Sequence, residues 1–214
     1  MVQTNATPSG ATASPAWAER RLEILRRAAE VFRERGFQGA GMREIAEGLG
    51  LAPGALYYYF PSKTDLLYAC QEISLDRLTE GARAIARTDA QAAERLRSLV
   101  DHHLEVILDV LGGSAAHLEF GALPPDRRRE IVKRRDAYER ILRKVIREGA
   151  EDGTLRRVDE KTTAMALLGA LNWTVVWWRP EGKRTATDLG TSYADLFLRG
   201  LAPADAGTGQ GRTP

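Results

Sequence analysis

Glycine and proline interrupt the chain at short intervals between Gly36 and Pro61, so only short helices can form there. Two apolar-periodic stretches, residues 42–49 and 53–59, fit this constraint, and a tight turn at residues 50–52 separates them. The second stretch begins with a proline, which the first turn of a helix tolerates. The segment therefore predicts two short helices joined by a turn of three to four residues.

Helical periodicity also dominates the rest of the chain, and no pair of strands is indicated. A first helix is expected over residues 17–35, with an apolar face made by Leu22, Leu25, Ala29 and Phe32. Gly36 should end this helix in a left-handed conformation. Later helices are expected over residues 62–86, 90–111, 115–120, 125–149, 159–178 and 185–198, with Ser62, Asp159 and Thr185 as caps.

This pattern predicts an all-α fold with a small N-terminal unit and a larger helical bundle. We assign the unit to residues 16–64 and the bundle to residues 65–201. The two ends, residues 1–15 and 202–214, are rich in small and polar residues, glycine and proline. We expect both ends to be disordered.

The composition excludes several classes of protein. Among the 214 residues, 31 Lys and Arg nearly balance 29 Asp and Glu, so the chain is neither histone-like nor an acidic disordered polymer. A single cysteine, Cys70, excludes an intrachain disulfide and a cysteine-based zinc site. The N-terminus has no secretory pattern, and no apolar run reaches the ~18 residues of a membrane span. We therefore expect a cytoplasmic protein with no membrane partner.

Residues 45–67, IAEGLGLAPGALYYYFPSKTDLL, resemble the signature of the TetR (tetracycline repressor) family. The resemblance extends over the first helix and the Gly36-Phe37 turn. It implies an N-terminal three-helix DNA-binding domain of the helix-turn-helix type and a C-terminal ligand-binding and dimerising bundle. It also implies a homodimer that binds a pseudo-palindromic operator in double-stranded DNA, with the second helix of the motif in the major groove.

Eight residues of this motif are candidates for DNA contact: Arg43, Pro53, Gly54, Ala55, Tyr57, Tyr58, Tyr59 and Lys63. The small residues allow close approach to the groove, and Ala55 can touch a thymine methyl group. The tyrosines can place hydroxyls on phosphates or bases, and Lys63 begins a helix where a phosphate is favoured. The alternatives are a solvated Arg43 and a mainly internal Tyr57.

The motif also departs from the family pattern. Ala40-Gly41 stands where the family usually has Thr-Ser, and Ala52 and Ala55 replace Ser or Thr. The missing hydroxyls put individual phosphate contacts in doubt but not the mode of binding. Residues 1–64 carry only 8 Lys and Arg against 6 Asp and Glu, so phosphate binding must depend on a few placed residues.

Residues 133–156 and 169–201 resemble a TetR subgroup that senses CoA thioesters, and this resemblance is less specific than that of the DNA-binding signature. It implies an acyl-CoA effector and no tightly bound cofactor. Candidate ligand contacts are His103, Arg134, Tyr138, Asn172 and Trp173. Residues 126–147 carry 10 Lys and Arg against 4 Asp and Glu, which fits either a site for CoA phosphates or an exposed charged helix.

The residues alone leave several of these assignments open. Arg134 on an apolar face needs an anionic partner, either a ligand phosphate or an internal carboxylate. His103 fits a satisfied core histidine better than a ligand contact. A metal site at His102, His103 and Glu105 is disfavoured because their spacing does not put three ligands on one helix face.

The stretch 161–178 is apolar nearly all round, so both of its sides must be buried. One side should pack on its own subunit and the other on a second copy of the chain. Together with the last helix it predicts a dimer interface containing Trp177, Trp178, Tyr193 and Phe197. Asn172 is the polar exception on the stretch 161–178 and fits either a register-setting hydrogen bond or a ligand contact.

These features together predict a ligand-responsive DNA-binding repressor that a small molecule releases from its operator. An uncharged hydrophobic effector is the alternative to an acyl-CoA. A helical metal–carboxylate enzyme is disfavoured because no Glu-x-x-His pair and no nucleophile–base constellation occurs. A helical adaptor would leave the segment 57–63 unexplained.

Overall fold

The computed structural model describes residues 14–109 and 118–203. Their regular elements are α1 (Pro15–Gly39), α2 (Met42–Glu47), α3 (Pro53–Tyr59), α4 (Lys63–Ala86), α5 (Ala92–Leu108), the 3₁₀ turn η2 (Glu119–Ala122), α6 (Pro125–Glu151), α7 (Glu160–Trp177) and α8 (Ala186–Leu201). The prediction of an all-α fold is confirmed.

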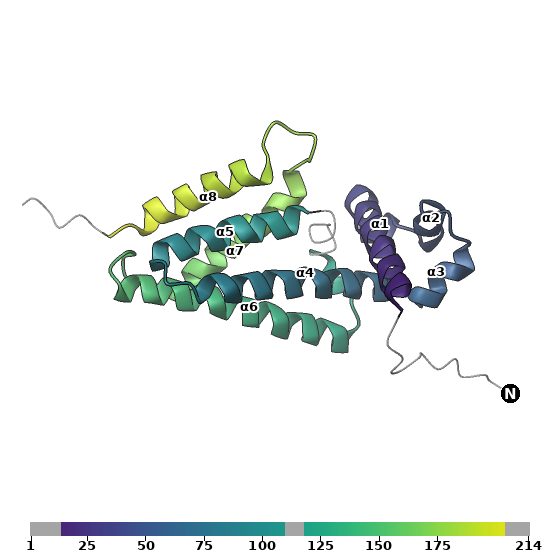
Figure 1. The fold of residues 1–214 in the computed structure, drawn as a ribbon, viewed down its shortest axis with the longest axis horizontal. Coiled ribbons are helices and arrows are strands. Elements are labelled where there is room, and N and C mark those ends of the chain that lie inside the picture. The colour runs from purple at the N-terminus through teal and green to yellow at the C-terminus, as the bar shows by residue number, and fades with distance from the viewer. Residues whose placement is uncertain (1–13, 110–117, 204–214) are drawn as a thin grey trace, which may run out of the picture.

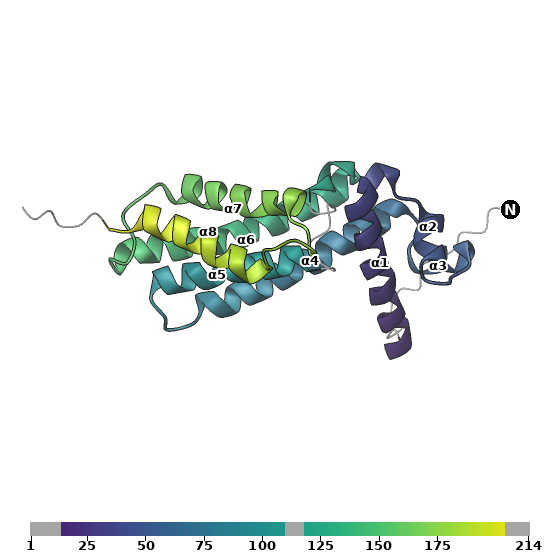
Figure 2. The same cartoon turned by 90° about the horizontal axis from the view of Figure 1, so that it is seen from above.

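Helices α1, α2 and α3 form a small unit at one end of an elongated molecule (Figure 1). Helix α4 leaves this unit and runs along the body, where it packs against α5 and α6. Helix α8 packs against α5, and α7 packs against α6, which completes the body (Figure 2). Helix α4 therefore contacts both α1 of the small unit and α6 of the body, and it connects the two parts.

Most predicted helix boundaries agree with the structure to within a few residues, and the caps explain why. Ser62 and Asp159 accept hydrogen bonds from backbone N–H groups of α4 and α7, and Thr185 forms a full capping box with Asp188. Gly36 has the expected left-handed φ of 68°, but helical structure resumes beyond it to Gly39.

Other expectations for the helices need correction. Leu22, placed on the apolar face of the first helix, is exposed, whereas the other three residues of that face are buried. Helix α1 begins at Pro15 with Ser14 as its cap, inside the segment expected to be disordered. Residues 1–13 and 204–214 of the two expected disordered ends, and residues 115–117 of the helix expected at 115–120, lie outside the described residues. The described end of that expected helix belongs to the 3₁₀ turn η2 instead of an α-helix.

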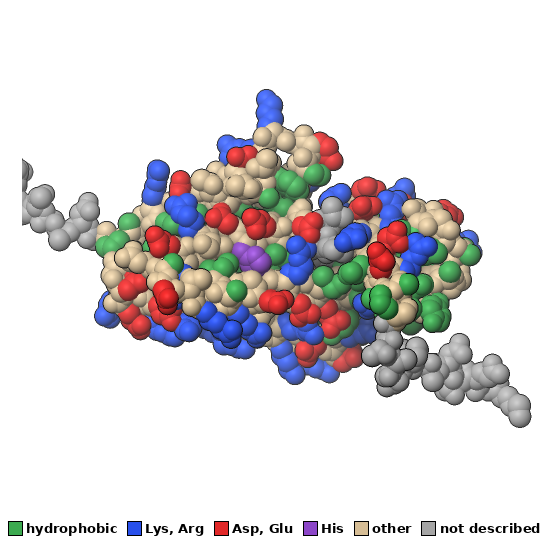
Figure 3. Space-filling model, viewed as in Figure 1, with side chains coloured by type: hydrophobic (Ala, Val, Ile, Leu, Met, Phe, Trp, Pro, Cys, Tyr) green, Lys and Arg blue, Asp and Glu red, His purple; other side chains and the backbone are tan. Residues whose placement is uncertain are grey.

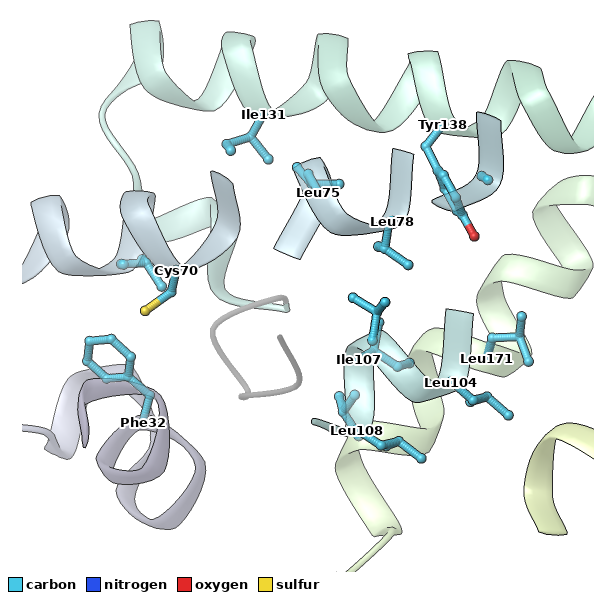
Figure 4. Close-up of a cluster of buried hydrophobic side chains, with 14 of the residues drawn as sticks. Phe32, Cys70, Leu75, Leu78, Leu104, Ile107, Leu108, Ile131, Tyr138 and Leu171 are labelled. Carbon is cyan, nitrogen blue, oxygen red and sulfur yellow. The ribbon is translucent and has the colours of Figure 1, made fainter. Parts of the chain in front are cut away.

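Buried aliphatic side chains from four helices meet in the body (Figure 4). Leu75 and Leu78 of α4 face Ile107 of α5 and Ile131 of α6, and the Tyr138 hydroxyl points into the same region. Phe32 of α1 and Cys70 of α4 continue this core into the small unit. The two parts of the molecule therefore share one continuous hydrophobic core.

Gly149 marks the closest approach at the far end of α6. A Cβ at this position would lie 2.5 Å from Cδ1 and 2.6 Å from Cγ of the buried Leu155. We expect Gly149→Ala to lower the free energy of unfolding by about 1–3 kcal/mol through overpacking. Urea unfolding measures it. Gly200→Ala is the matched control, since a Cβ there meets nothing within 4 Å; equal stabilities for the two variants would contradict this account.

Candidate nucleic-acid interface and effector site

The turn between α2 and α3 is closed by backbone hydrogen bonds. The N–H of Leu51 donates to the carbonyl of Ala46 at 2.9 Å, and Gly50 adopts a left-handed φ of 63° that favours glycine. Ile45 and Leu56 are fully buried and hold the two short helices together. This geometry is a helix-turn-helix with α3 as its outer helix.

The outward face of α3 carries small residues and tyrosines. Pro53 and Gly54 are exposed at its first turn, and a Cβ added to Gly54 would meet nothing within 4 Å. Tyr57 and Tyr58 are 48% and 70% exposed, so the alternative of a mainly internal Tyr57 does not hold. Ala55 is half-buried. The face therefore offers two phenol hydroxyls and a backbone that a partner can approach closely.

Tyr59 differs from its two neighbours because it packs on the body of the unit. Its ring centroid lies 5.7 Å from that of Trp17 and 5.3 Å from that of Tyr58. This stacking fixes the C-terminal end of α3 against the start of α1. Arg43 is exposed in the first turn of α2 and makes no ion pair among the described residues, so its guanidinium is available to a phosphate or a base edge.

Lys63 has a different role from the one expected. Its ammonium donates to the carbonyls of Phe37 (2.7 Å), Ala40 (3.0 Å) and Gln38 (3.3 Å), and it lies 4.5 Å from the centroid of the Phe37 ring. All three donors are thus used inside the protein. Lys63 ties the end of α1 to the start of α4 and has no donor left for a phosphate.

We expect Lys63→Met to lower the free energy of unfolding by about 1–3 kcal/mol, since it leaves partly buried carbonyls without a donor. Thermal unfolding measures this effect. The salt dependence of DNA binding supplies the second readout: its slope should not change, because no phosphate contact is removed. A slope reduced by about one counterion with unchanged stability would instead restore the phosphate role.

Three of the five predicted ligand contacts meet inside the body. His103 of α5 lies 2.9 Å from the Tyr138 hydroxyl of α6 through Nδ1 and 3.2 Å from Oδ1 of Asn172 of α7 through Nε2. With Oδ1 as acceptor, Nε2 carries the proton, and Tyr138 donates to Nδ1. Burial lowers the pKa of His103 to about 4 and raises the pKa of Tyr138. The histidine is therefore neutral and satisfied, and the trio joins three helices.

Arg134, the fourth predicted contact, is engaged by internal carboxylates. Its guanidinium pairs with Glu72 at 3.0 Å and Asp76 at 2.8 Å on α4, and with Glu130 one turn earlier on α6 at 3.6 Å. The sequence allowed either a ligand phosphate or an internal carboxylate as the partner of Arg134, and the structure shows carboxylates of the same chain. The placement of Arg134 as a ligand contact is not supported, because three carboxylates already neutralise its charge.

Trp173, the fifth predicted contact, lies on the outer face of α7 and is 62% exposed. It shares that face with Met165, Val176 and Trp177, while Leu167, Leu171 and Val175 are buried on the opposite side. Leu196 of α8 is also exposed, at 66%. The expectation that this helix is apolar on both sides is therefore met, and Trp173 belongs to the outer side instead of the interior.

The residues assigned to the dimer interface differ in exposure: one lies on the outer face of α7 and three pack on their own subunit. Trp177 is 46% exposed, whereas Trp178, Tyr193 and Phe197 are partly buried against the core of their own subunit. The indole N–H of Trp178 donates to the carbonyl of Arg184 at 2.9 Å. Trp178 is thus fixed within the subunit, since its N–H is already paired.

A second ion pair, which the sequence patterns did not predict, joins α4 and α6. Arg127 contacts Asp65 at 2.5 Å and lies 5.0 Å from the centroid of the Tyr68 ring. Asp65 also accepts a hydrogen bond from the cap residue Ser62, so the first turn of α6 is linked to the first turn of α4. The signal was present as acids at positions 65, 72 and 76, which share one face of a helix.

Within the described residues, no group of three or more His, Cys, Asp or Glu side chains is arranged to hold a metal ion. No helix in the same ranges combines the length and the hydropathy that a membrane span requires.

A helix-turn-helix unit joined by a long helix to an all-helical body has the architecture of a DNA-binding transcriptional regulator. Residues 24–70 match the bacterial regulatory proteins of the tetR family, and residues 89–201 match the tetracyclin repressor-like C-terminal domain. The chain belongs to the TetR family. The members of this family and the relatives of this chain are transcriptional regulators, so the chain is a regulator and not an enzyme.

Individual relatives agree with this assignment. The HTH-type transcriptional repressor KstR2 of Mycobacterium tuberculosis is 29% identical over 193 residues, covering 85% of this chain and 92% of its own. The crystal structure of PfmR from Thermus thermophilus superposes with a TM-score of 0.77 at 32% identity, covering 84% and 99% of the two chains. AibR, in complex with isovaleryl coenzyme A and operator DNA, has a TM-score of 0.70 at 28% identity, covering 86% and 98%.

Proposed function

We propose that this TetR-type repressor binds a pseudo-palindromic operator as a homodimer and is released by an acyl-CoA thioester. The observation that carries the effector assignment is the trio of His103, Tyr138 and Asn172, which places hydrogen-bonding groups deep in an apolar bundle. A thioester carbonyl can accept a hydrogen bond there while its acyl chain contacts the aliphatic core. The structure of AibR with isovaleryl coenzyme A supports this chemistry in a relative.

The trio also explains how an effector would act. A ligand carbonyl that accepts from the Tyr138 hydroxyl must break its hydrogen bond to His103, whereas Asn172 can donate through Nδ2 while Oδ1 stays paired with His103. The three residues belong to α6, α7 and α5. Helix α6 is joined to α4 by the ion pairs of Arg127 and Arg134. A ligand changes DNA affinity only by its differential affinity for the two arrangements of α6 against α4.

On the DNA side, we assign contacts to Arg43 and to the exposed face of α3, which contains Pro53, Gly54, Ala55, Tyr57 and Tyr58. Tyr59 and Lys63 hold this face in place. We assign DNA binding to residues 16–64 and effector binding and dimerisation to residues 65–201. The operator as target supports a cytoplasmic location.

Fluorescence anisotropy on DNA from the upstream region of the gene tests the effector assignment. We expect the full chain to bind this DNA, and acyl-CoAs of one chain-length range to weaken binding by about 5–150-fold, the usual range of allosteric coupling. Release by free hydrophobic compounds but by no acyl-CoA would favour the uncharged-effector alternative. Unchanged binding with every acyl-CoA would overturn the effector assignment and leave the repressor intact.

A second copy of the chain is the partner we assign to the outer face of α7 and α8, which a monomer would leave as an apolar surface. We expect Trp173→Glu to raise the dimer dissociation constant about 30-fold or more, the effect of losing a central aromatic anchor. Sedimentation equilibrium measures it. Val132→Glu on the exposed face of α6 is the control. A Trp173 variant that stays as dimeric as the control would exclude this face from the interface.

A further inference from the structure

The outer side of α6 contains a hollow that none of the preceding assignments uses. Its volume is about 540 Å³, and it is lined by Phe120, Pro125, Arg128, Arg129, Val132 and Lys133. Lys and Arg side chains gather along the edge of the molecule where α6 runs (Figure 3). The hollow lies outside the bundle, because Ile131 and Tyr138 mark the inward face of the same helix.

The charge of the hollow has one sign. Arg128, Arg129 and Lys133 make no ion pair among the described residues, and no acidic side chain lines the hollow. Five other cations of α6 are paired: Arg127 with Asp65, Arg134 with acids of α4, and the cations at 143, 144 and 147 with glutamates. Arg140 also makes no ion pair among the described residues, but it lies outside the hollow. Three uncompensated cations around one hollow repel one another, so an anion bound between them is favoured.

A larger hollow between α4 and α6, of about 720 Å³, lacks this property. Asp76 and Glu80 line it together with its arginines. Arg134, its cation from α6, already pairs with three carboxylates. An anion entering there would have to displace those acids, whereas the hollow on the outer side of α6 requires no such exchange.

The apolar lining narrows the class of anion. Phe120, Pro125 and Val132 give the hollow an apolar floor, and Val132 is 40% exposed. Phe120 already carries the Arg135 guanidinium 4.4 Å from its ring centroid. Inorganic phosphate has no apolar surface, so these three side chains would stay in contact with water if it bound. A ligand with a flat ring and two or more phosphate charges would cover the floor and pair with the cations.

We propose that the hollow binds a nucleoside phosphate, with its ring over Phe120 and Val132 and its phosphates between Arg128, Arg129 and Lys133. The site lies next to Arg127, whose ion pair with Asp65 links α6 to the start of α4. A ligand bound in the hollow would therefore lie beside an ion pair to α4, the helix that carries the DNA-binding unit. A free nucleotide can supply this ring and these phosphates. The nucleotide end of an acyl-CoA can supply them too, and that alternative rests on the proposed function.

Calorimetric titration of the full chain with adenosine 3′,5′-bisphosphate tests the site itself. We expect saturable binding with one ligand per chain, weakened about tenfold or more in Arg129→Ala/Lys133→Ala, since two charge-assisted contacts to the phosphates are lost. Arg140→Ala is the matched control, because Arg140 is exposed on the same helix without an ion pair among the described residues and lies outside the hollow.

Several results would overturn the site: no binding of the bisphosphate, equal losses in the double variant and the control, or inorganic pyrophosphate binding as tightly as the bisphosphate. The last result would show that the apolar floor is unused. All variants are surface substitutions, and their thermal unfolding midpoints should match that of the parent chain, which keeps a loss of binding interpretable.

A second titration separates the two sources of the nucleotide. An acyl-CoA is compared with the same acyl group on pantetheine, which lacks the nucleotide. If the hollow holds the nucleotide end of the effector, the double variant weakens the acyl-CoA and leaves the acyl-pantetheine unchanged. If it weakens neither but still weakens the bisphosphate, a free nucleotide is the ligand. Failure of both thioesters to bind would overturn the effector proposal while the bisphosphate result stands.

Discussion

A glutamate in place of Gly54 should abolish operator binding without harming the fold. Gly54 is the second residue of α3, is exposed, and has open space around the position of a Cβ. A carboxylate in the first turn of a helix is favoured by the helix dipole, so stability should stay the same or rise by about 0.3–1 kcal/mol. In the complex the same carboxylate would meet the phosphates and the acceptor-rich groove edge.

We expect Gly54→Glu to weaken operator binding about 100-fold or more, equivalent to about 2.7 kcal/mol. Anisotropy titrations measure binding, and thermal unfolding measures stability. Gly54→Gln separates bulk from charge, since it adds the same volume without the negative charge; it should lose less affinity than the glutamate variant. Operator binding within threefold of the parent chain for Gly54→Glu would show that this end of α3 does not face DNA.

The second large effect concerns acid stability. Burial holds the pKa of His103 at about 4 in the folded chain, against about 6.5 for an unfolded histidine. Between these values the unfolded chain binds a proton that the folded chain does not, so stability falls as the pH falls from about 6.5 to about 4. Below about 4 both states are protonated, and this group contributes no further loss. The full difference is about 3 kcal/mol.

Urea unfolding at neutral pH and near pH 4.5 measures this loss, of which about 2–3 kcal/mol is expected within that interval. His103→Gln supplies the comparison, because carboxylates such as Asp152 and Asp188 titrate alike in both chains and cancel. The variant should be less stable at neutral pH but should lose about 2–3 kcal/mol less on acidification. Equal pH dependences would mean that His103 becomes charged inside the folded chain.

The role of Lys63 depends on residues far from it along the chain. Its position at the start of α4 is a local property, which the cap Ser62 defines. Its ammonium instead pairs with carbonyls of residues 37–40, which are distant along the chain. A motif cannot reveal such a pairing, since it depends on the angle at which α1 ends beside α4.

The ligand candidates show the same division. Helical spacing placed His103 and Tyr138 on apolar faces and left Asn172 as a polar exception, and the structure joins all three in one hydrogen-bonded trio. Arg134 and Trp173 do not belong to that trio. Arg134 pairs with acids on α4, and Trp173 lies exposed on the outer face of α7. Periodicity identifies a face of a helix, but the neighbour of that face is a tertiary property.

The sequence by itself determined the helices, their caps and the helix-turn-helix, because hydrogen bonds and steric limits within a few residues decide them. It also determined the family, through a signature carried by one continuous segment. Only the tertiary structure decided which charges are already paired, which aromatic side chains stay exposed, and which hollow keeps uncompensated cations. Those properties depend on groups brought together from distant helices, and electrostatic and packing energies are set by distances that no local pattern fixes.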